Sequence, residues 1–292
     1  MKLTNKFNLP QPIVAAVARD PYTKGDAHIS VTGLIGPARK RMLEIVHADE
    51  ITEDVADRIW SLIGQIGHGI LERADVEAMT EERFFIERHG WRISGQFDRL
   101  VLVTGVLQDY KFTTSYSVKE GAKDEWVAQE NIYKLLLETH GYTVNKLQVV
   151  AILRDWQKRQ AKSSALYPQL PVAVIDLPIW SRDQTEAYIT QRLAAHANAQ
   201  HVLPECTPQE RWARPDTFAV MKAGNTKATS THLSADEAHA AIDALRRAGK
   251  AATYSVERRP GENKRCDDYC PAASHCDQYK KINRVDRIDF AG

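Results

Sequence analysis

The sequence predicts an α/β protein with a small second module at its C-terminal end. Between residues 52 and 153, stretches with helical periodicity alternate with short apolar runs typical of strands, in the order helix, three strands, helix, strand. Two carboxylates and a lysine stand on two neighbouring predicted strands, and every cysteine comes later in the chain. We therefore expect a core domain over residues 1–200, with an N-terminal helical lead, and a cysteine-bearing region over residues 201–292.

The composition is that of an ordinary globular protein. Hydrophobic residues make up 43% and charged residues 26% of the 292 residues, enough to bury a substantial core. The net charge of +1 gives no global sign of a nucleic-acid partner, so any basic surface must be local. Residues 1–6 lack the apolar run of a signal peptide, and no stretch approaches a membrane span. We expect a cytoplasmic protein with no membrane partner.

The predicted catalytic groups lie in the stretch from Ser94 to Lys111. Its apolar residues predict two adjoining strands with a turn at Gly105, and Asp98 and Asp109 stand at their ends. Because strand side chains alternate between two faces, Asp109 and Lys111 point to the same side. Two acids and a lysine on one face suit a hard cation such as Mg²⁺. Acid–lysine pairs at this spacing are also common on solvated strands, so this pair indicates a catalytic site only together with the other motifs.

An amphipathic helix is predicted from Thr52 to Arg73, because apolar residues recur at spacings of three and four. His68 lies late on this helix, between Gly67 and Gly69. Each glycine costs about 1 kcal/mol in a helix relative to alanine, which indicates close approach by another backbone or by a ligand. A packed or surface histidine is the alternative interpretation of His68.

The remaining elements of the core follow in order. The patterns predict a helix over 37–47, a hairpin turning at 89–90, a helix over 123–140, strands over 147–153 and 172–177, and a helix over about 182–197. Gln129 and Tyr133 are four residues apart on the 123–140 helix and share a face. They belong either to a functional surface or to an ordinary helix surface.

A basic loop over residues 154–162 is the densest positive run near the predicted core. Arg154, Lys158 and Arg159 would contact phosphates, and Trp156 would stack on a base. A solvated loop with the indole packed inward is the alternative.

The cysteines indicate a metal centre in the C-terminal region. Clustered cysteines in a cytoplasmic protein bind metal more often than they form disulfides, and four thiolates suit zinc or an iron–sulfur cluster equally. The four are Cys206, Cys266, Cys270 and Cys276. Between the first two, the pattern predicts two strands, a helix capped by Ser234 and a third strand. We expect the metal centre to pin the ends of this ββαβ module together.

Taken together, these features resemble the PD-(D/E)XK nuclease superfamily, in particular its RecB-like and CRISPR-associated exonuclease branch, over about residues 30–200. His68 matches the metal-binding histidine that a helix supplies in that family. Asp98, in Gly95-Gln96-Phe97-Asp98, matches the aspartate at the end of a strand. The resemblance implies a restriction-endonuclease-like core, in which helices flank a mixed central sheet.

Two further motifs carry the resemblance. Asp109-Tyr110-Lys111 matches the acid-x-Lys signature, and Gln129 with Tyr133 matches the Gln-x-x-x-Tyr signature on the next helix.

The resemblance implies metal-assisted hydrolysis of DNA. The implied ligands of Mg²⁺ or Mn²⁺ are His68, Asp98, Asp109 and the backbone carbonyl of Tyr110. Lys111 would orient or deprotonate the attacking water. Gln129 and Tyr133 would contact DNA or position the site.

The resemblance also favours a 4Fe–4S cluster over structural zinc, because RecB-like nucleases with a cluster carry a similar C-terminal cysteine triplet. In those relatives the first cysteine usually precedes the nuclease motifs. In this chain Cys206 would be the fourth ligand from beyond the core.

Three functions remain in competition. The first is a phage-type or mobile-element DNA exonuclease, acting on DNA with a single-stranded portion or a free end, beside a recombinase, helicase or single-strand-binding protein. The second is a structure-specific endonuclease of the same fold. The third is a non-catalytic nucleic-acid-binding or assembly factor. The intact set of Asp98, Asp109 and Lys111 argues against the third, because an inactive site would tend to lose one of them.

Overall fold

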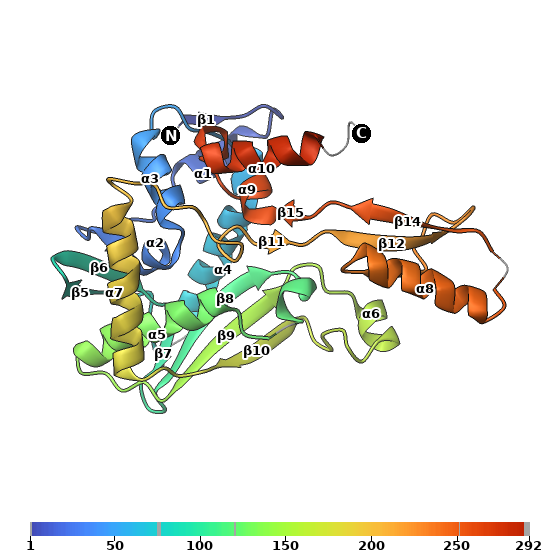
Figure 1. Cartoon of the computed structure of the whole chain (residues 1–292). Helices are drawn as coiled ribbons and strands as arrows, with labels where there is room; N and C mark the ends of the chain where they lie inside the picture. Colours follow the sequence, from blue (N-terminus) through green and yellow to red (C-terminus); the bar gives the residue numbers. More distant parts are fainter. Residues whose placement is uncertain (1, 75–76, 120, 251, 289–292) are drawn as a thin grey trace. The chain divides into compact units, whose positions relative to one another are not determined.

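The structure is a computed structural model that describes residues 2–74, 77–119, 121–250 and 252–288. The chain divides into two compact units. The first contains Met1–Met42 and Ala48–Pro204, and the second contains Leu43–His47 and Glu205–Gly292. Each unit has a sheet of its own (Figure 1).

A mixed five-stranded sheet forms the centre of the first unit, in the order β10-β9-β8-β7-β4 (Figure 1). Only β8 and β9 run parallel; the other neighbouring pairs are antiparallel. The strands are β4 (Met79–Thr80), β7 (Arg99–Val101), β8 (Val106–Thr113), β9 (Lys146–Leu153) and β10 (Val172–Leu177). A parallel pair needs a long crossover connection, and helix α5 (Asp124–Thr139) supplies it. The mixed sheet confirms the α/β class.

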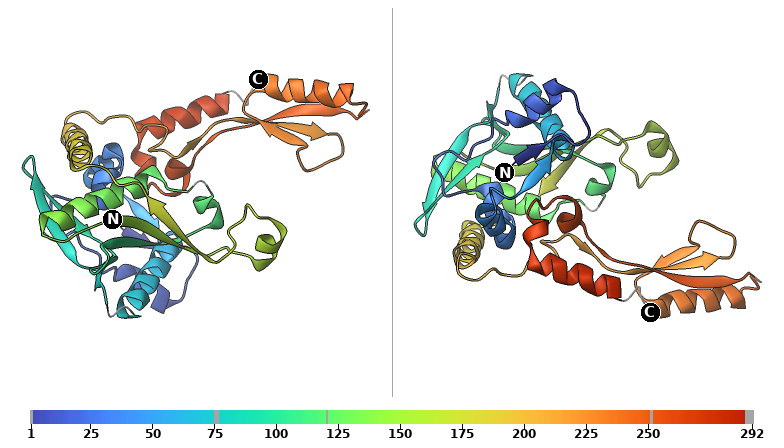
Figure 2. Two further views of the ribbon diagram at one scale, coloured as in Figure 1. Left: turned by 90° about the horizontal axis from the view of Figure 1, so that it is seen from below. Right: turned by 90° about the horizontal axis from the view of Figure 1, so that it is seen from above.

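Helices α5 and α4 (Ile59–Ala74) contact opposite faces of β8. Asp109 and Lys111 of β8 bond to Gln129 of α5, whereas the Phe112 ring lies against Gly67 of α4. Odd and even residues of a strand face opposite sides, so the two helices lie on either side of the sheet. Most of α5 is buried, and Figure 2 shows it running along the sheet from two further directions.

The helix predicted from Thr52 begins later than expected. Residues Thr52–Asp54 form strand β3, which pairs in parallel with β1 (Lys2–Thr4). The Asp54 carboxylate accepts hydrogen bonds from Thr4 Oγ1 and from the Lys6 amide, both at 2.8 Å. These bonds hold the segment extended, and a 3₁₀ turn over Val55–Arg58 leads into α4. The prediction of helix at 52–58 is therefore wrong, because a pairing with the distant N-terminal strand overrides the local pattern.

A second, three-stranded sheet in the first unit has the order β2-β6-β5. The predicted hairpin is confirmed: His89 and Gly90 adopt φ values of 51° and 76° between β5 and β6, as a tight two-residue turn requires. The strands and remaining helices of this unit are β2 (Ile29–Ser30), β5 (Arg83–Arg88), β6 (Trp91–Gln96), α1 (Gln11–Ala18), α2 (Val31–Ile35), α6 (Lys158–Ser163) and α7 (Arg182–Asn198). Helix α3 (Ala38–Val46) contributes residues to both units.

The second unit contains a three-stranded antiparallel sheet, in the order β13-β12-β14, with helix α8 packed on it. Val220, Ala238 and Ile242 form its small buried core. Ser234 caps α8 by accepting a hydrogen bond from the Glu237 amide. The elements are β11 (Ala213–Arg214), β12 (Thr217–Lys222), β13 (Ser230–His232), α8 (Ala235–Arg247), β14 (Tyr254–Arg259), β15 (Glu262–Asn263), α9 (Lys264–Asp268) and α10 (Asp277–Ile288). Across the described ranges, no helix has the length and hydropathy to cross a membrane.

Candidate active site

Asp109, Lys111 and Gln129 form a hydrogen-bonded cluster on one face of the central sheet. Lys111 Nζ lies 2.9 Å from Asp109 Oδ1 and donates to Gln129 Oε1 at 3.3 Å. Gln129 Nε2 donates to Asp109 Oδ1 at 2.8 Å and to the Tyr133 hydroxyl at 3.2 Å. Asp109 and Lys111 thus lie on the same face of β8, as the alternation of side chains along a strand predicts. Helix α5 brings Gln129 and Tyr133 to them.

Gly95 on β6 is required by the position of Tyr133. A Cβ atom at Gly95 would lie 2.8 Å from a ring carbon of the buried Tyr133, closer than side-chain atoms approach one another. The absence of a side chain at residue 95 therefore lets α5 seat its tyrosine against β6.

The surroundings of this cluster favour protonated carboxyls and a charged lysine. Burial raises the pKa of Asp109 to about 6, although Lys111 opposes the shift. Burial opposes the charge of Lys111, but the neighbouring acids, Asp109 foremost and Asp98 next, together outweigh burial and raise the lysine pKa. Glu130 is 1% exposed, neither of its carboxylate oxygens has a hydrogen-bond partner among the described residues, and burial raises its pKa well above the usual value. Buried acids in excess of buried cations favour the binding of an added cation.

His68, Glu81 and Asp98 form a second cluster. His68 Nδ1 lies 3.3 Å from Glu81 Oε1 and 3.5 Å from Asp98 Oδ1. One ligand atom from each residue lies within 4.8 Å of the other two. Burial opposes protonation of His68, but the bonds and charges of Asp98 and Glu81 raise its pKa to about 10. The two carboxylates suit Mg²⁺ or Mn²⁺, and the imidazole offers a third ligand atom.

The backbone joins the two clusters. The Tyr110 amide donates to Asp98 Oδ2 at 2.5 Å, so Asp98 is anchored beside the residue that lies between Asp109 and Lys111. The Tyr110 ring stands edge-on to His68, with centroids 6.2 Å apart. The metal-binding role of the Tyr110 carbonyl oxygen stays a prediction.

Glu81 is the residue of this site that the sequence analysis missed. It lies between β4 and β5 in the left-handed region, with φ 51°, and its amide donates to the Asp98 carbonyl at 3.2 Å. Its Oε2 accepts a hydrogen bond from Gln96 Nε2 at 2.8 Å. The only signal in the sequence is the adjacent acid pair Glu81-Glu82 before a strand, which has no periodicity to mark it.

Gly67 explains how α4 brings His68 to the sheet. A Cβ atom at Gly67 would lie 1.8 Å from Phe112 Cζ, whereas a Cβ at Gly69 would meet nothing within 4 Å. The close approach expected beside His68 therefore occurs at one of the two glycines, and its partner is the aromatic ring of Phe112.

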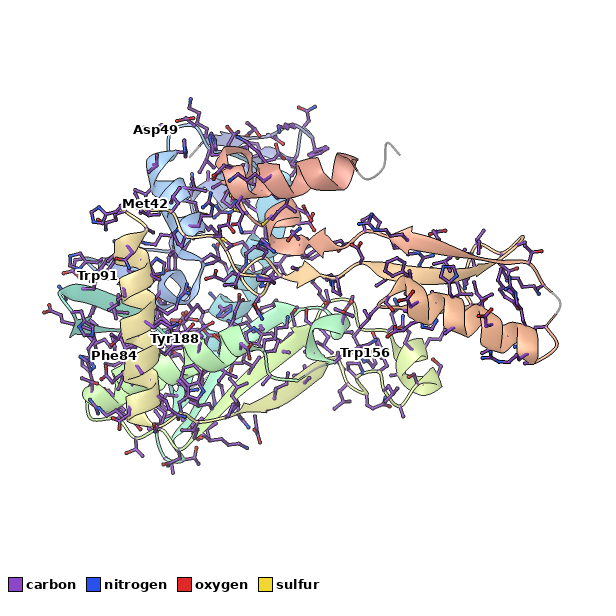
Figure 3. The ribbon with its side chains drawn as sticks, viewed as in Figure 1. Met42, Asp49, Phe84, Trp91, Trp156 and Tyr188 are labelled. Carbon is purple, nitrogen blue, oxygen red and sulfur yellow. The ribbon has the colours of Figure 1, made fainter. Side chains whose placement is uncertain are left out.

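The basic loop differs from the expectation in two respects. Residues Lys158–Ser163 form helix α6, which carries Lys158 and Arg159 on the segment that extends beyond β9 and β10 (Figure 2). Trp156, labelled in Figure 3, is half-buried against the hydrophobic core. Its Nε1 donates to the Pro168 carbonyl at 2.8 Å. The alternative interpretation, an indole packed inward, therefore describes Trp156. Arg154 is exposed and stacks on Trp60 of α4.

The four cysteines all lie in the second unit. Burial, followed by the charges of Cys270 and Cys276, raises the pKa of Cys266 to about 11. The Gln278 side chain accepts from the Cys206 amide at 2.8 Å and donates to the Cys206 carbonyl at 2.9 Å. Because Gln278 follows Cys276 by two residues, this pair of bonds ties Cys206 to the cysteine triplet.

The fold and the site define an α/β protein with a candidate carboxylate–histidine cation site beside a half-buried lysine. A model of the PD-(D/E)XK nuclease superfamily matches residues 37–277. The chain belongs to this superfamily, which implies a metal-dependent nuclease with a nucleic-acid substrate. Among solved structures, the crystal structure of SSO0001 is similar, with a TM-score of 0.47 and 18% sequence identity over 68% of this chain and 87% of that one. No curated protein matches the chain.

Replacing Glu81 by glutamine is expected to weaken Mn²⁺ binding by about 10- to 100-fold, the range for altered support of a metal site. The amide keeps the size of the side chain but removes a negative charge beside His68 Nδ1. Titration calorimetry with Mn²⁺ measures the change. Glu82→Gln is the matched control, because Glu82 is exposed. Equal Mn²⁺ affinities of the two variants would exclude Glu81 from the site.

Proposed function

We propose that this protein is a Mg²⁺- or Mn²⁺-dependent DNA exonuclease of the RecB-like branch. The main support is the arrangement of Asp109, Lys111 and Gln129 beside the His68–Glu81–Asp98 cluster, joined by the bond from the Tyr110 amide to Asp98. Membership of the superfamily supports the class of reaction. A role in phage or mobile-element recombination, repair or processing, in the cytoplasm and beside a recombinase, helicase or single-strand-binding protein, belongs to the same proposal.

The divalent ion would be held by His68, Glu81, Asp98 and Asp109, and when bound it supplies Lewis-acid stabilisation of the charge on the scissile phosphate. Lys111 forms an ion pair with Asp109, and its side chain is 28% exposed. It would hold an attacking water and neutralise charge that develops on the phosphate. Gln129 keeps Lys111 and Asp109 in position by bonding to both.

Cleavage of DNA with different ends tests this function against its alternatives. The purified protein is incubated with end-labelled linear DNA and with closed circular DNA, in Mg²⁺, in Mn²⁺ and with EDTA. An exonuclease degrades only the linear substrate and only with metal. Cleavage of the circle, or of branched DNA at one site, would support a structure-specific endonuclease. Binding without cleavage in either metal would support the non-catalytic assembly factor.

We further propose that Cys206, Cys266, Cys270 and Cys276 hold one structural centre, either a 4Fe–4S cluster or zinc. The bonds of Gln278 to Cys206 and the effect of Cys270 and Cys276 on the pKa of Cys266 support a common site. A cation would offset the charge that neighbouring thiolates build up beside Cys266. Four protein thiolates leave no position for water, so the role is structural.

Metal analysis of protein purified without oxygen distinguishes the two centres. A cubane cluster gives brown protein with iron and sulfide near four each per chain, whereas zinc gives colourless protein with one metal. Cys270→Ser is expected to destabilise the second unit and to leave Mn²⁺ binding at the nuclease site in place. Absence of both iron and zinc from the anaerobic preparation would refute the centre.

A further inference from the structure

Helix α4 presents an exposed aromatic–cation pair that no proposed role so far explains. The Arg154 guanidinium carbon lies 3.9 Å from the centre of the Trp60 ring, a cation–π stack. Trp60 is 55% exposed, unusual for so large an apolar side chain. Arg154 is exposed as well, and no carboxylate within the described ranges lies at ion-pair distance from its guanidinium.

The α4 helix places this pair at one end of the nuclease site. Trp60 precedes His68 by eight residues, about 12 Å along a helix. The rings of Tyr110 and Phe112 of β8 lie near His68. Arg154, which stacks on Trp60, follows the last residue of the neighbouring strand β9. Helix α4 therefore runs antiparallel to β8, with Trp60 toward the carboxyl end of that strand.

The distance from Lys111 agrees with this placement. Lys111 pairs with Ala151 in the β8–β9 ladder, and Arg154 follows three residues later, about 10 Å along a strand. The Arg154 amide donates to the Thr113 carbonyl at 3.0 Å, which anchors Arg154 at the end of β8. The distances from the Trp60–Arg154 pair to His68 and to Lys111 are thus ones that a few nucleotides of extended single-stranded DNA would span.

The chemistry of the pair fits an unpaired nucleobase. An indole face and a guanidinium plane are the two surfaces on which splayed bases stack, whereas the bases of an intact duplex already stack on one another. Helix α6 adds Lys158, Arg159 and Lys162, all without an ion-pair partner among the described residues, and these cations suit an anionic backbone.

We propose that Trp60 and Arg154 form a stacking platform for an unpaired base of single-stranded DNA bound at the nuclease site. This inference rests on the proposed function and specifies its substrate: a strand that is single-stranded beside the scissile bond. The exposed tryptophan of α4 takes the role that the sequence pattern assigned to Trp156.

Binding of a labelled oligonucleotide tests the platform in the full-length chain. All proteins carry Asp109→Asn, so the DNA stays intact, and the affinity for a fluorescein-labelled thymidine oligonucleotide is measured by anisotropy in Ca²⁺. Trp60→Ala is expected to weaken binding about 5- to 140-fold, the range for loss of one base–aromatic stack, and Trp60→Phe to weaken it less. The control is Trp212→Ala, because Trp212 carries an equivalent stack with Arg265 at 4.1 Å in the second unit; it is expected to bind like its parent.

Abasic substitutions show whether a base is the occupant. An oligonucleotide with one abasic position, moved along the strand, is expected to lose affinity at a single register in the parent protein and at none in Trp60→Ala. The platform is refuted if Trp60→Ala binds like Trp212→Ala, if the abasic scan is flat in the parent protein, or if Trp60→Ala weakens duplex binding to the same degree. Normal cleavage by the native protein together with any of these results overturns the platform alone. Failure of the native protein to bind or cut DNA overturns the nuclease proposal as well.

Discussion

Asp109→Asn is expected to abolish cleavage while the protein remains folded. Asparagine keeps the shape of the side chain and its Oδ1 still accepts from Gln129, but the negative charge that binds Lys111 and a metal ion is lost. Removal of one preorganised electrostatic group from an active site costs about 100- to 1000-fold in rate. Lys111 keeps contact with water, since its side chain is 28% exposed, so the loss of its partner does not strand a fully buried charge.

Single-turnover kinetics with Mn²⁺ measure the rate of cleavage, and circular dichroism measures whether the variant is folded. Asp176→Asn is the matched control: Asp176 is a strand aspartate in an ion pair with Lys146, but its side chain is 64% exposed. It is expected to cleave at the native rate. Lys111→Ala is expected to bind Mn²⁺ and to lose turnover. Native-like cleavage by folded Asp109→Asn or Lys111→Ala would remove these residues from the catalytic site.

Gly67→Ala is expected to have the largest structural effect of any small substitution on α4. The added methyl group would overlap the Phe112 ring at 1.8 Å, so the helix or the ring must move. Overpacking of this kind costs about 1–3 kcal/mol of stability. Because His68 is the next residue, the same movement would separate its imidazole from Asp98 and Glu81, and we expect cleavage to fall with it.

Gly69→Ala provides the comparison, because its Cβ would meet nothing within 4 Å. Helix propensity alone then stabilises that variant by up to about 1 kcal/mol. Urea unfolding measures the stability of the two variants, and cleavage assays measure their activity. Gly67→Ala combined with Phe112→Leu is expected to recover part of the stability and part of the cleavage rate that Gly67→Ala loses. Equal stability and activity of the two alanine variants would show that the contact between α4 and β8 does not position His68.

The parts of the fold that follow from local pattern were predictable to within a residue or two. The helix over 123–140 and the strands over 147–153 and 172–177 agree closely with α5, β9 and β10, because each has a strong apolar pattern and clear ends. Strand β3 was not predictable, since its pairing with Lys2–Thr4 joins segments about fifty residues apart.

In the candidate site, too, some contacts follow from local sequence pattern and others depend on segments distant in the sequence. The shared face of Asp109 and Lys111 follows from strand alternation, and the contact of Gln129 with both could be expected once α5 crosses from β8 to β9. Glu81 enters the site through a left-handed backbone turn and a bond from its amide to Asp98, neither of which leaves a pattern in the sequence. The inward packing of Trp156 depends on the Pro168 carbonyl twelve residues away. The residues next to Trp156 in the sequence therefore do not indicate whether its side chain is exposed.

Helix α4 has a consequence for the dynamics of the site. None of its residues is buried, and it contains three glycines, whereas α5 is buried along most of its length. Segments with few buried contacts open at lower free energy than the global unfolding transition. Amide protons of α4 should therefore exchange with solvent faster than those of α5. A divalent ion that binds His68 on the helix and Asp98 beside the sheet would cross-link the two, so metal should slow exchange in α4 far more than in α5.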